Sequence, residues 1–478
     1  MLDSINNVVV QIVDILYQPY IVPLLLILGG IYFTIRTGLM QFRFFGESIR
    51  VVKEKPHEGG ISSFGALMVS TASRVGTGNI IGVSTAIILG GAGAIFWMWI
   101  TALLGGATAF VESTLAQIYK KKNPDGTSYG GPAFYMQQAL NARWLGVIFS
   151  VLIIFTYAVG YNMLAAYNLQ STFAAFSFYK EGTTPMIIGI ILAVLFAIIV
   201  LGGAKRLVHV TGVLVPVMGV TYVVVAIIVL IMNAGNLPAM FSRIFSSAFD
   251  FHAIFGGFAG SCLMWGLKRG LYSNEAGMGS APNAAATADV SHPAKQGLVQ
   301  MLSVFIDTLL ICTATAFMCM STDIGAKAST YVDAEGGAQA APFVQDALHS
   351  TLGSFGPIFI AVAMSLFAFT TLIGNYSYCE GCLKFIMKKE PSPAFMLVFR
   401  LIAAGLVFVG SIATANLVWN TADMAQGLMV VTNVPSILIL GGVAIKCFKD
   451  YEKQKKAGVN PEFKAADIDL KQDTDFWK

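Results

Sequence analysis

Charged residues are scarce in this chain. Asp, Glu, Lys and Arg make up only 12% of its 478 residues, whereas soluble proteins carry about 25%. Hydrophobic residues account for 56% of the sequence, and the mean hydropathy is +0.70. No polar linker divides the chain into domains, although a soluble core stops growing at about 250–300 residues. We therefore predict an all-α polytopic membrane protein whose apolar surface faces lipid.

Motifs of soluble catalytic and nucleotide-binding proteins are also missing. The sequence contains no G-x-x-x-x-G-K-[ST] loop, which would bind phosphate, and no H-E-x-x-H pair, which would bind zinc. Cys379 and Cys382 form a C-x-x-C, but no second pair and no nearby histidine completes a metal site. We therefore expect neither an enzyme nor a bound cofactor. The net charge of +4 comes from short loops between apolar runs, so it does not indicate a nucleic-acid partner.

Long apolar runs are what the sequence does contain. A membrane-spanning helix needs about 20 mostly apolar residues, and eleven segments qualify: 19–39, 62–90, 91–118, 145–170, 185–201, 208–232, 252–267, 297–320, 356–387, 396–415 and 425–446. These runs are too long for the alternating strands of an outer-membrane barrel. Val8–Leu16, before the first span, lacks the basic flank of a signal peptide and is predicted to be an amphipathic surface helix.

Lysine and arginine predict the orientation of these spans, because cytoplasmic loops carry an excess of both. With Arg74 and Arg400 set aside as lying in or at the edge of helices, the split is 25 against 3. This count places Lys268 and Arg269 in a cytoplasmic loop, Lys268–His292, which forms either an inner gate or an ordered packing loop. We predict a multi-pass protein of the plasma (inner) membrane, with the N-terminus outside and a cytoplasmic tail, 447–478.

Two of the predicted spans are interrupted by glycines. The second contains Val75-Gly76-Thr77-Gly78-Asn79, and the seventh contains Gly256-Gly257-Phe258-Ala259-Gly260-Ser261. Glycine in a membrane helix often only permits close packing, but broken helices at matching positions of two halves indicate a transporter binding site. The two breaks are five spans apart, so their spans cross the bilayer in opposite directions. Residues 62–232 and 252–446 are therefore predicted to be inverted repeats, with 1–61 as an addition.

The residues around the first break suit a small zwitterion and a cation. Free N–H groups at a half-helix N-terminus favour a carboxylate, and freed carbonyls favour a cation. In the ninth span Phe367, Thr370 and Thr371 share one helix face, so two hydroxyls can reach an ion, although membrane threonines usually bond back to their own helix. These ligands favour sodium; a proton relay, which usually uses Asp, Glu or His, is the alternative.

Arg74, Glu112 and Asp307 carry charge well inside predicted spans. Because unpaired charges are costly in a membrane, Arg74 is expected to pair with Glu112 or Asp307, and a role for Arg74 in binding a substrate carboxylate is the alternative. A channel would need a continuous polar pore, and the spans offer few polar residues for one. A secondary transporter therefore fits the sequence better than a channel or an intramembrane enzyme.

Several motifs resemble those of the alanine or glycine:cation symporter family, also called the sodium:alanine symporter family. The similarity runs from about residue 20 to 446 and rests on four runs: Val75–Ile80, Gly90–Trp99, Gly130–Ala133 and Lys268–Gly277, the last followed by Gly279–Pro282. The resemblance implies a LeuT-type fold, a 5+5 inverted repeat preceded by one extra N-terminal helix. It also implies sodium-coupled symport of a small neutral amino acid, alanine or glycine, by alternating access.

The resemblance also implies a set of site residues. Sodium would be bound by the carbonyls of Ala72, Val75 and Phe367 and the hydroxyls of Thr370 and Thr371. The substrate would contact residues of both breaks and of the fourth span: Thr77, Gly78, Asn79, Ala165, Gly256, Gly257, Phe258, Gly260 and Ser261. The fourth span departs from the family pattern, because Ala165 replaces an amide side chain and Tyr167 a small polar one. The preferred amino acid could therefore differ from alanine or glycine, with glutamine or serine as alternatives.

Overall fold

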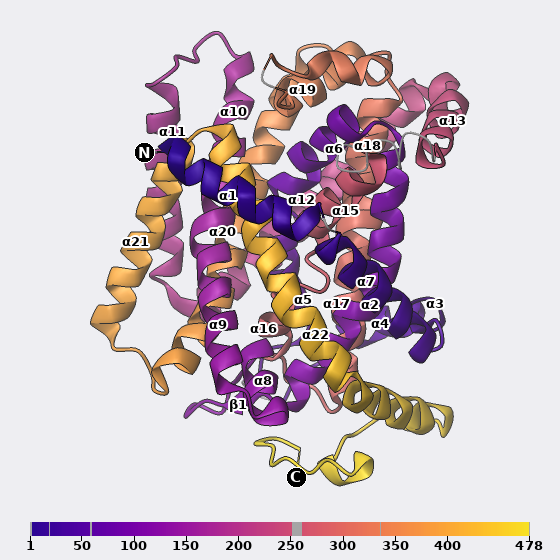
Figure 1. The fold of residues 1–478 in the computed structure, drawn as a ribbon, viewed down its shortest axis with the longest axis vertical. Coiled ribbons are helices and arrows are strands. Elements are labelled where there is room, and N and C mark those ends of the chain that lie inside the picture. The colour runs from indigo at the N-terminus through magenta and orange to yellow at the C-terminus, as the bar shows by residue number, and fades with distance from the viewer. Residues whose placement is uncertain (1, 19, 58–59, 251–260, 335, 478) are drawn as a thin grey trace.

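The chain folds almost entirely into helices (Figure 1). The structure is a computed structural model that describes residues 2–18, 20–57, 60–250, 261–334 and 336–477. A short antiparallel hairpin, β1 (Lys121–Lys122) with β2 (Ser128–Tyr129), lies at the end of the molecule that carries the C-terminus, whereas the N-terminus lies in the upper part of the view.

The helices of the first half reach residue 232. They are α1 (Leu2–Tyr17), α2 (Ile21–Arg36), α3 (Met40–Arg43), α4 (Phe45–Val52), α5 (Ser63–Arg74), η1 (Gly78–Gly82), α6 (Val83–Gly90), α7 (Gly93–Ile118), α8 (Pro132–Leu140), α9 (Arg143–Ile154), η2 (Phe155–Gly160), α10 (Tyr161–Thr172), η3 (Phe173–Ala175), α11 (Thr184–Val200) and α12 (Gly203–Met232). Of these, η1 and η2 are π-helical and η3 is a 3₁₀ turn.

The second half begins at the top of the view and ends in the tail. Its helices are η4 (Ala234–Asn236), α13 (Leu237–Ala248), α15 (Cys262–Asn274), α16 (Ala281–Ala285), α17 (Pro293–Val304), η6 (Phe305–Cys312), α18 (Thr313–Met320), η7 (Ile324–Tyr331), α19 (Ala340–Leu352), α20 (Phe355–Met387), α21 (Pro393–Ser411), α22 (Ala415–Lys456) and η8 (Ala465–Ile468). The η6 segment is a further π-helical stretch, in the middle of an otherwise α-helical span.

Most of the predicted spans are helices of sufficient length. Within the described ranges, eight helical segments are long and apolar enough to cross a membrane, and the bent pair Ser63–Arg74 with Gly78–Gly90 makes a ninth. α11 is apolar but has only 17 residues. Most of the span predicted at 252–267 lies outside the described residues. The helical membrane architecture is thus confirmed, while the count of eleven stays a prediction.

The N-terminal amphipathic segment is a helix, α1, that packs along α22. Its apolar face is buried through Val9, Val13 and Leu16. At its end the Tyr17 hydroxyl donates to the backbone carbonyl of Asp423, and Gln426 Nε2 donates to the same hydroxyl at 3.0 Å. One face of the helix is therefore held by α22 through both apolar packing and hydrogen bonds.

Lys268 and Arg269 do not lie in a loop, so that part of the topology prediction was wrong. Both are in α15, and the Arg269 side chain is only 3% exposed. Arg269 Nη2 lies 2.8 Å from Asp423 Oδ2, and Lys268 Nζ lies 3.9 Å from the same oxygen. The Arg269 guanidinium also stacks over the Trp419 ring at 4.3 Å. A buried carboxylate and an aromatic ring from α22 thus stabilise the two cations, which were expected to be solvated by water in a loop.

Removing the Asp423 carboxylate is expected to destabilise the protein strongly, because Arg269 would remain buried without its partner. Asp423→Ala should lower the free energy of unfolding by about 3–5 kcal/mol. Thermal unfolding of the detergent-purified protein measures the effect. Asp475→Asn is the control, since the Lys121–Asp475 pair is about one third exposed on both sides and should contribute about 1 kcal/mol or less. Equal melting temperatures for Asp423→Ala and wild type would contradict the prediction.

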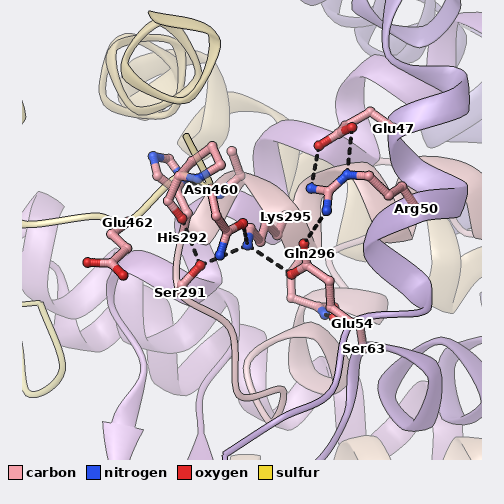
Figure 2. A network of polar contacts seen from close by, with 12 residues as sticks. Glu47, Arg50, Glu54, Ser63, Ser291, His292, Lys295, Gln296, Asn460 and Glu462 are labelled. Atoms are coloured by element: carbon pink, nitrogen blue, oxygen red, sulfur yellow. Dashed lines mark hydrogen bonds and ion pairs between the residues drawn. The ribbon is translucent and has the colours of Figure 1, made fainter. Parts of the chain in front are cut away.

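A polar network joins α4, α17 and the C-terminal tail (Figure 2). Lys295 Nζ donates to Glu54 Oε2, Ser291 Oγ and Asn460 Oδ1, each at 2.8 Å, and its side chain is 1% exposed. Glu54 also pairs with Arg50 at 2.8 Å. The network connects the tail to the start of the span that carries Asp307.

His292 caps the N-terminus of α17. Its Nδ1 accepts from the Ala294 N–H at 3.2 Å. Burial lowers the pKa of His292 to about 3, with a smaller contribution in the same direction from Lys295, so the ring is neutral near pH 7. Because Nδ1 accepts, Nε2 carries the proton and donates to Asp450 Oδ2 at 3.2 Å. That contact is a hydrogen bond between neutral imidazole and carboxylate.

Candidate functional site

The first break leaves two carbonyls without their helical donors. α5 ends at Arg74, and Val75 has a ψ of 89°; the flanking helices meet at a 52° bend. In a continuous helix the N–H of Gly76 would donate to Ala72 and that of Asn79 to Val75. Here the Gly76 N–H donates to Asn79 Oδ1 at 2.7 Å, and the Asn79 N–H donates to the Gly76 carbonyl at 3.1 Å. The carbonyls of Ala72 and Val75 are therefore free to bind a cation.

α20 places one threonine hydroxyl directly beside this break. A Cβ added to Gly76 would lie 1.9 Å from Thr371 Oγ1. Thr371 Oγ1 is buried and has no hydrogen-bond partner within the described ranges. Thr370 differs, because its hydroxyl lies 3.0 Å from the Leu366 carbonyl and 3.1 Å from the Phe367 carbonyl of its own helix. Of the two predicted hydroxyls, only that of Thr371 is aimed at the break and unoccupied.

Of the glycine run predicted as the second break, the structure describes Ser261. Gly256, Gly257, Phe258 and Gly260 lie outside the described residues. Ser261 caps the N-terminus of α15, where its hydroxyl accepts from the Met264 N–H at 3.3 Å. α15 approaches the first break only near its other end: a Cβ on Gly78 would lie 2.5 Å from Tyr272 Cε1. Tyr272 is eleven residues beyond Ser261, or roughly 16 Å along the helix.

The helix interruption next to the first break spans Glu275–Ser280. It separates α15 from α16, and three of its residues have positive φ: 56° at Glu275, 89° at Gly277 and 78° at Gly279. Gly277 and Gly279 are required there, because L side chains rarely adopt these conformations. These residues belong to the segment Lys268–His292, which was predicted to be a cytoplasmic loop because it carries Lys268 and Arg269. We name α15, Glu275–Ser280 and α16 the second broken span.

Asn79 contributes to the structure of the first break. Besides accepting from Gly76, its Nδ2 donates to Asp307 Oδ1 at 2.7 Å and to Ser273 Oγ at 3.1 Å. Asp307 lies in the π-helical η6 and also accepts from the Thr308 hydroxyl. The amide of Asn79 is thus occupied by neighbours from two other spans, and its role as a substrate ligand stays a prediction.

Arg74 forms no direct ion pair with Glu112 or Asp307, so the predicted pairing was wrong. Across the described residues, no carboxylate lies within 4.0 Å of the guanidinium, and Nη1 donates instead to the Gln300 carbonyl at 3.3 Å. Nε and Nη2 have no partner there. The guanidinium still attracts both carboxylates and that of Glu275 electrostatically. One buried cation, Arg74, therefore interacts electrostatically with three buried carboxyl groups.

α10 reaches the first break through Asn168. Its Nδ2 donates to Thr77 Oγ1 at 3.2 Å, and Ala165, three residues earlier on the same face, is completely buried. The structure thus brings Thr77 and Gly78 together with Asn168 and Tyr272, of which the last two were missed. Nothing in the sequence alone marks Asn168, whereas Tyr272 lies inside the most specific of the family motifs.

Similarity to known proteins agrees with this geometry. The model of the family described as "Sodium:alanine symporter family" matches residues 2–465. The chain belongs to the sodium:alanine symporter family. It is 44% identical over 452 residues to the amino-acid carrier protein AlsT of Bacillus subtilis (strain 168), covering 94% of this chain and 93% of that protein. The probable sodium/glutamine symporter GlnT of the same organism is 43% identical over 454 residues, covering 94% and 91%.

A solved structure shows the fold. MhsT in complex with L-phenylalanine superimposes with a TM-score of 0.54 at 16% identity, covering 81% of this chain and 97% of that one. Membership of this transporter family and the apolar helices make the chain a multi-pass membrane protein, and its fold is similar to that of MhsT, a LeuT-fold protein.

Proposed function

We propose that this protein is a sodium-coupled symporter that carries a small neutral amino acid, most readily alanine or glycine, into the cell by alternating access. The observation that carries the proposal is the meeting of two broken spans at one buried place. There the first break holds the free carbonyls of Ala72 and Val75, and the Thr371 hydroxyl, unpartnered among the described residues, lies beside Gly76 of the same break. Carbonyl and hydroxyl oxygens are the ligands that a hard cation prefers, and half-helix ends suit a zwitterionic substrate.

Eleven spans in a 5+5 inverted repeat fit this function. The count adds α11 and the second broken span to the nine spans described above. Gly266 of α15 packs against Ala94 at the start of α7, and Ala276 packs against Gly105 further along α7. α15 therefore runs in the direction of α7. Ala288 contacts both Ile61, before α5, and Gln117, at the end of α7.

The start of the first broken span lies beside the end of α7, so that span runs against α7, whereas α15 runs with it. This arrangement supports opposite directions for the two broken spans.

The corrected charge count supports an outside N-terminus and a cytoplasmic C-terminus in the plasma (inner) membrane: without Lys268 and Arg269, the split becomes 23 against 3.

The sodium site we propose consists of the carbonyls of Ala72, Val75 and Phe367 with the hydroxyls of Thr371 and Thr370. The substrate is proposed to contact Thr77 and Gly78 from one side and the second broken span from the other. Proton coupling is a second candidate, because Glu112, Glu275 and Asp307 are all completely buried, and buried intramembrane carboxyls are typical of proton pathways.

Uptake into proteoliposomes tests the proposed function. Labelled alanine, glycine, serine and glutamine are offered with an inward sodium gradient or with choline in its place. Accumulation of alanine or glycine only with sodium is the expected result. Equal uptake in sodium and choline would overturn sodium coupling. Accumulation of glutamine alone would overturn alanine or glycine as the substrate.

Restoring an amide at position 165 is expected to disfavour larger substrates. Ala165 is completely buried near Thr77, so Ala165→Gln should reduce glutamine uptake relative to alanine uptake by about tenfold or more, because pocket volume discriminates at about 1–3 kcal/mol. Competition between the two labelled amino acids measures the ratio. Ala174→Gln, at an exposed position, is the control, and an unchanged ratio in Ala165→Gln would show that position 165 does not line the pocket.

A further inference from the structure

A chain of buried hydrogen bonds connects the two broken spans with α20 and α10. Glu275 Oε2 accepts from the Ser280 hydroxyl at 2.7 Å, across the second break. Glu275 Oε1 lies 3.1 Å from Ser73 Oγ, in the last turn of α5. Ser73 Oγ lies 2.6 Å from Asn375 Oδ1 of α20, and Asn375 Nδ2 donates to Asn162 Oδ1 of α10 at 3.0 Å. The proposed sodium site and the proposed substrate site are both built on elements that this chain of hydrogen bonds joins.

If Glu275 is ionised, this chain of hydrogen bonds has one proton fewer than its contacts require. A serine hydroxyl has a single proton to donate, yet Ser73 Oγ faces two acceptors, Glu275 Oε1 and Asn375 Oδ1. Asn375 Oδ1 is the acceptor in the amide orientation in which Nδ2 donates to Asn162 Oδ1. The proton of Ser73 therefore goes to Asn375, at the shorter distance, and the contact with Glu275 needs a proton that only the Glu275 carboxyl can supply.

Among the described residues, the cation that acts on the buried Glu275 carboxyl is Arg74. Glu275 and Ser280 are completely buried, and Ser73 is 4% exposed. The titratable and charged groups that face it are Arg74 of α5, Tyr157 of η2, Tyr161 of α10, Tyr272 of α15 and Tyr378 of α20. Arg74 is not within 4.0 Å of Glu275, so no ion pair compensates an ionised carboxylate there.

We propose that Glu275 is a positioning residue that binds one exchangeable proton and, in its protonated form, joins the first broken span to the second. Loss of that proton leaves Ser73 with too few protons for both of its contacts, so the two broken spans separate at this point. The inference rests on the proposed transport function and adds to it the residue through which proton binding controls closure.

The test compares Glu275→Gln, Glu275→Ala and Ser73→Ala with wild type. The glutamine amide donates to Ser73 and accepts from Ser280 as the protonated acid does, but it cannot ionise. Glu380→Gln is the matched control, because it neutralises a carboxyl of α20 that pairs with Arg400 and touches neither break. Initial rates of alanine uptake are recorded from about pH 6 to pH 9, together with the alanine KM and the sodium half-saturation.

Wild type and Glu380→Gln are expected to lose activity with rising pH, by at most about tenfold per pH unit beyond the midpoint, and Glu275→Gln is expected to show a flat profile. Glu275→Ala and Ser73→Ala should raise the alanine KM and the sodium half-saturation together. A wild-type pH profile in Glu275→Gln, or unchanged constants in Glu275→Ala, would overturn the inference.

Two features keep this test separate from that of the proposed function. If wild-type uptake is independent of sodium, the function fails, but the pH profile of that uptake still decides the role of Glu275. If Glu275→Ala does not fold, the comparison of Glu275→Gln with Glu380→Gln decides it alone.

Discussion

Thr371→Val is expected to raise the sodium concentration for half-maximal uptake by about ten- to a hundredfold or more, the range that the loss of a group supporting a metal site typically gives. Valine has the shape of threonine but lacks the oxygen. Thr371 Oγ1 is buried and unpartnered among the described residues, and it lies beside Gly76 of the first break. Its removal takes away the one uncommitted hydroxyl of the proposed site.

Thr370→Val is expected to have a smaller effect. Its hydroxyl already bonds to the Leu366 and Phe367 carbonyls and lies 3.5 Å from Met218 Sδ. Sodium-titrated uptake of alanine measures both variants. Ser365→Ala is the control, because Ser365 lies on the same helix and its hydroxyl donates only to the Ala361 carbonyl. Wild-type sodium dependence in Thr371→Val would remove Thr371 from the sodium site.

The sequence predicted the fold well where hydrophobicity alone determines it. Nine of the eleven apolar runs are long helices or the bent pair. The first break was predicted because Gly76-Thr77-Gly78 lies inside an otherwise apolar run, and the structure places the bend there.

The sequence failed where charge is buried. Lys268 and Arg269 were predicted to lie in a loop, because no local pattern indicates the residue that compensates their charge. That residue, Asp423 on α22, lies 154 residues from Arg269. The second break was predicted at 256–261 from its glycines, and of that run the structure describes Ser261, which caps α15. The interruption at Glu275–Ser280 was missed, because the same misplacement put it in a loop. Tertiary compensation of charge overrode the local rule that charges end a span.

The partners of buried side chains could not be predicted from the sequence for the same reason. Arg74 was expected to pair with Glu112 or Asp307, but it bonds to Gln300. Asp307 accepts from Asn79, and Asn433 donates to Glu112 at 2.8 Å. Each of these partners is more than 200 residues distant in the chain, so only the fold brings them together.

Gly76→Ala is expected to abolish transport. The new Cβ would lie 1.9 Å from Thr371 Oγ1 and 3.1 Å from its Cβ, so either α20 moves away from α5 or the threonine leaves the site. Gly374 lets the same two helices pack backbone against backbone, since a Cβ there would lie 2.4 Å from the Ser73 backbone nitrogen, so the contact leaves no room for an added methyl group. Overpacking of this kind costs about 1–3 kcal/mol of stability. Sodium-driven alanine uptake, normalised to protein inserted in the membrane, measures the loss.

Gly82→Ala supplies the matched control, because it changes the same residue type in the same interrupted span. Its Cβ would meet its nearest neighbour, Tyr272, at 3.6 Å, an ordinary contact, so most of the activity should remain. The double variant Gly76→Ala/Thr371→Ala separates packing from ligation: removal of the threonine oxygen relieves the 1.9 Å clash and should restore stability, but it also removes the proposed ligand. Restored stability without sodium dependence is therefore expected, whereas full sodium-driven uptake in the double variant would show that Gly76 and Thr371 only pack against each other.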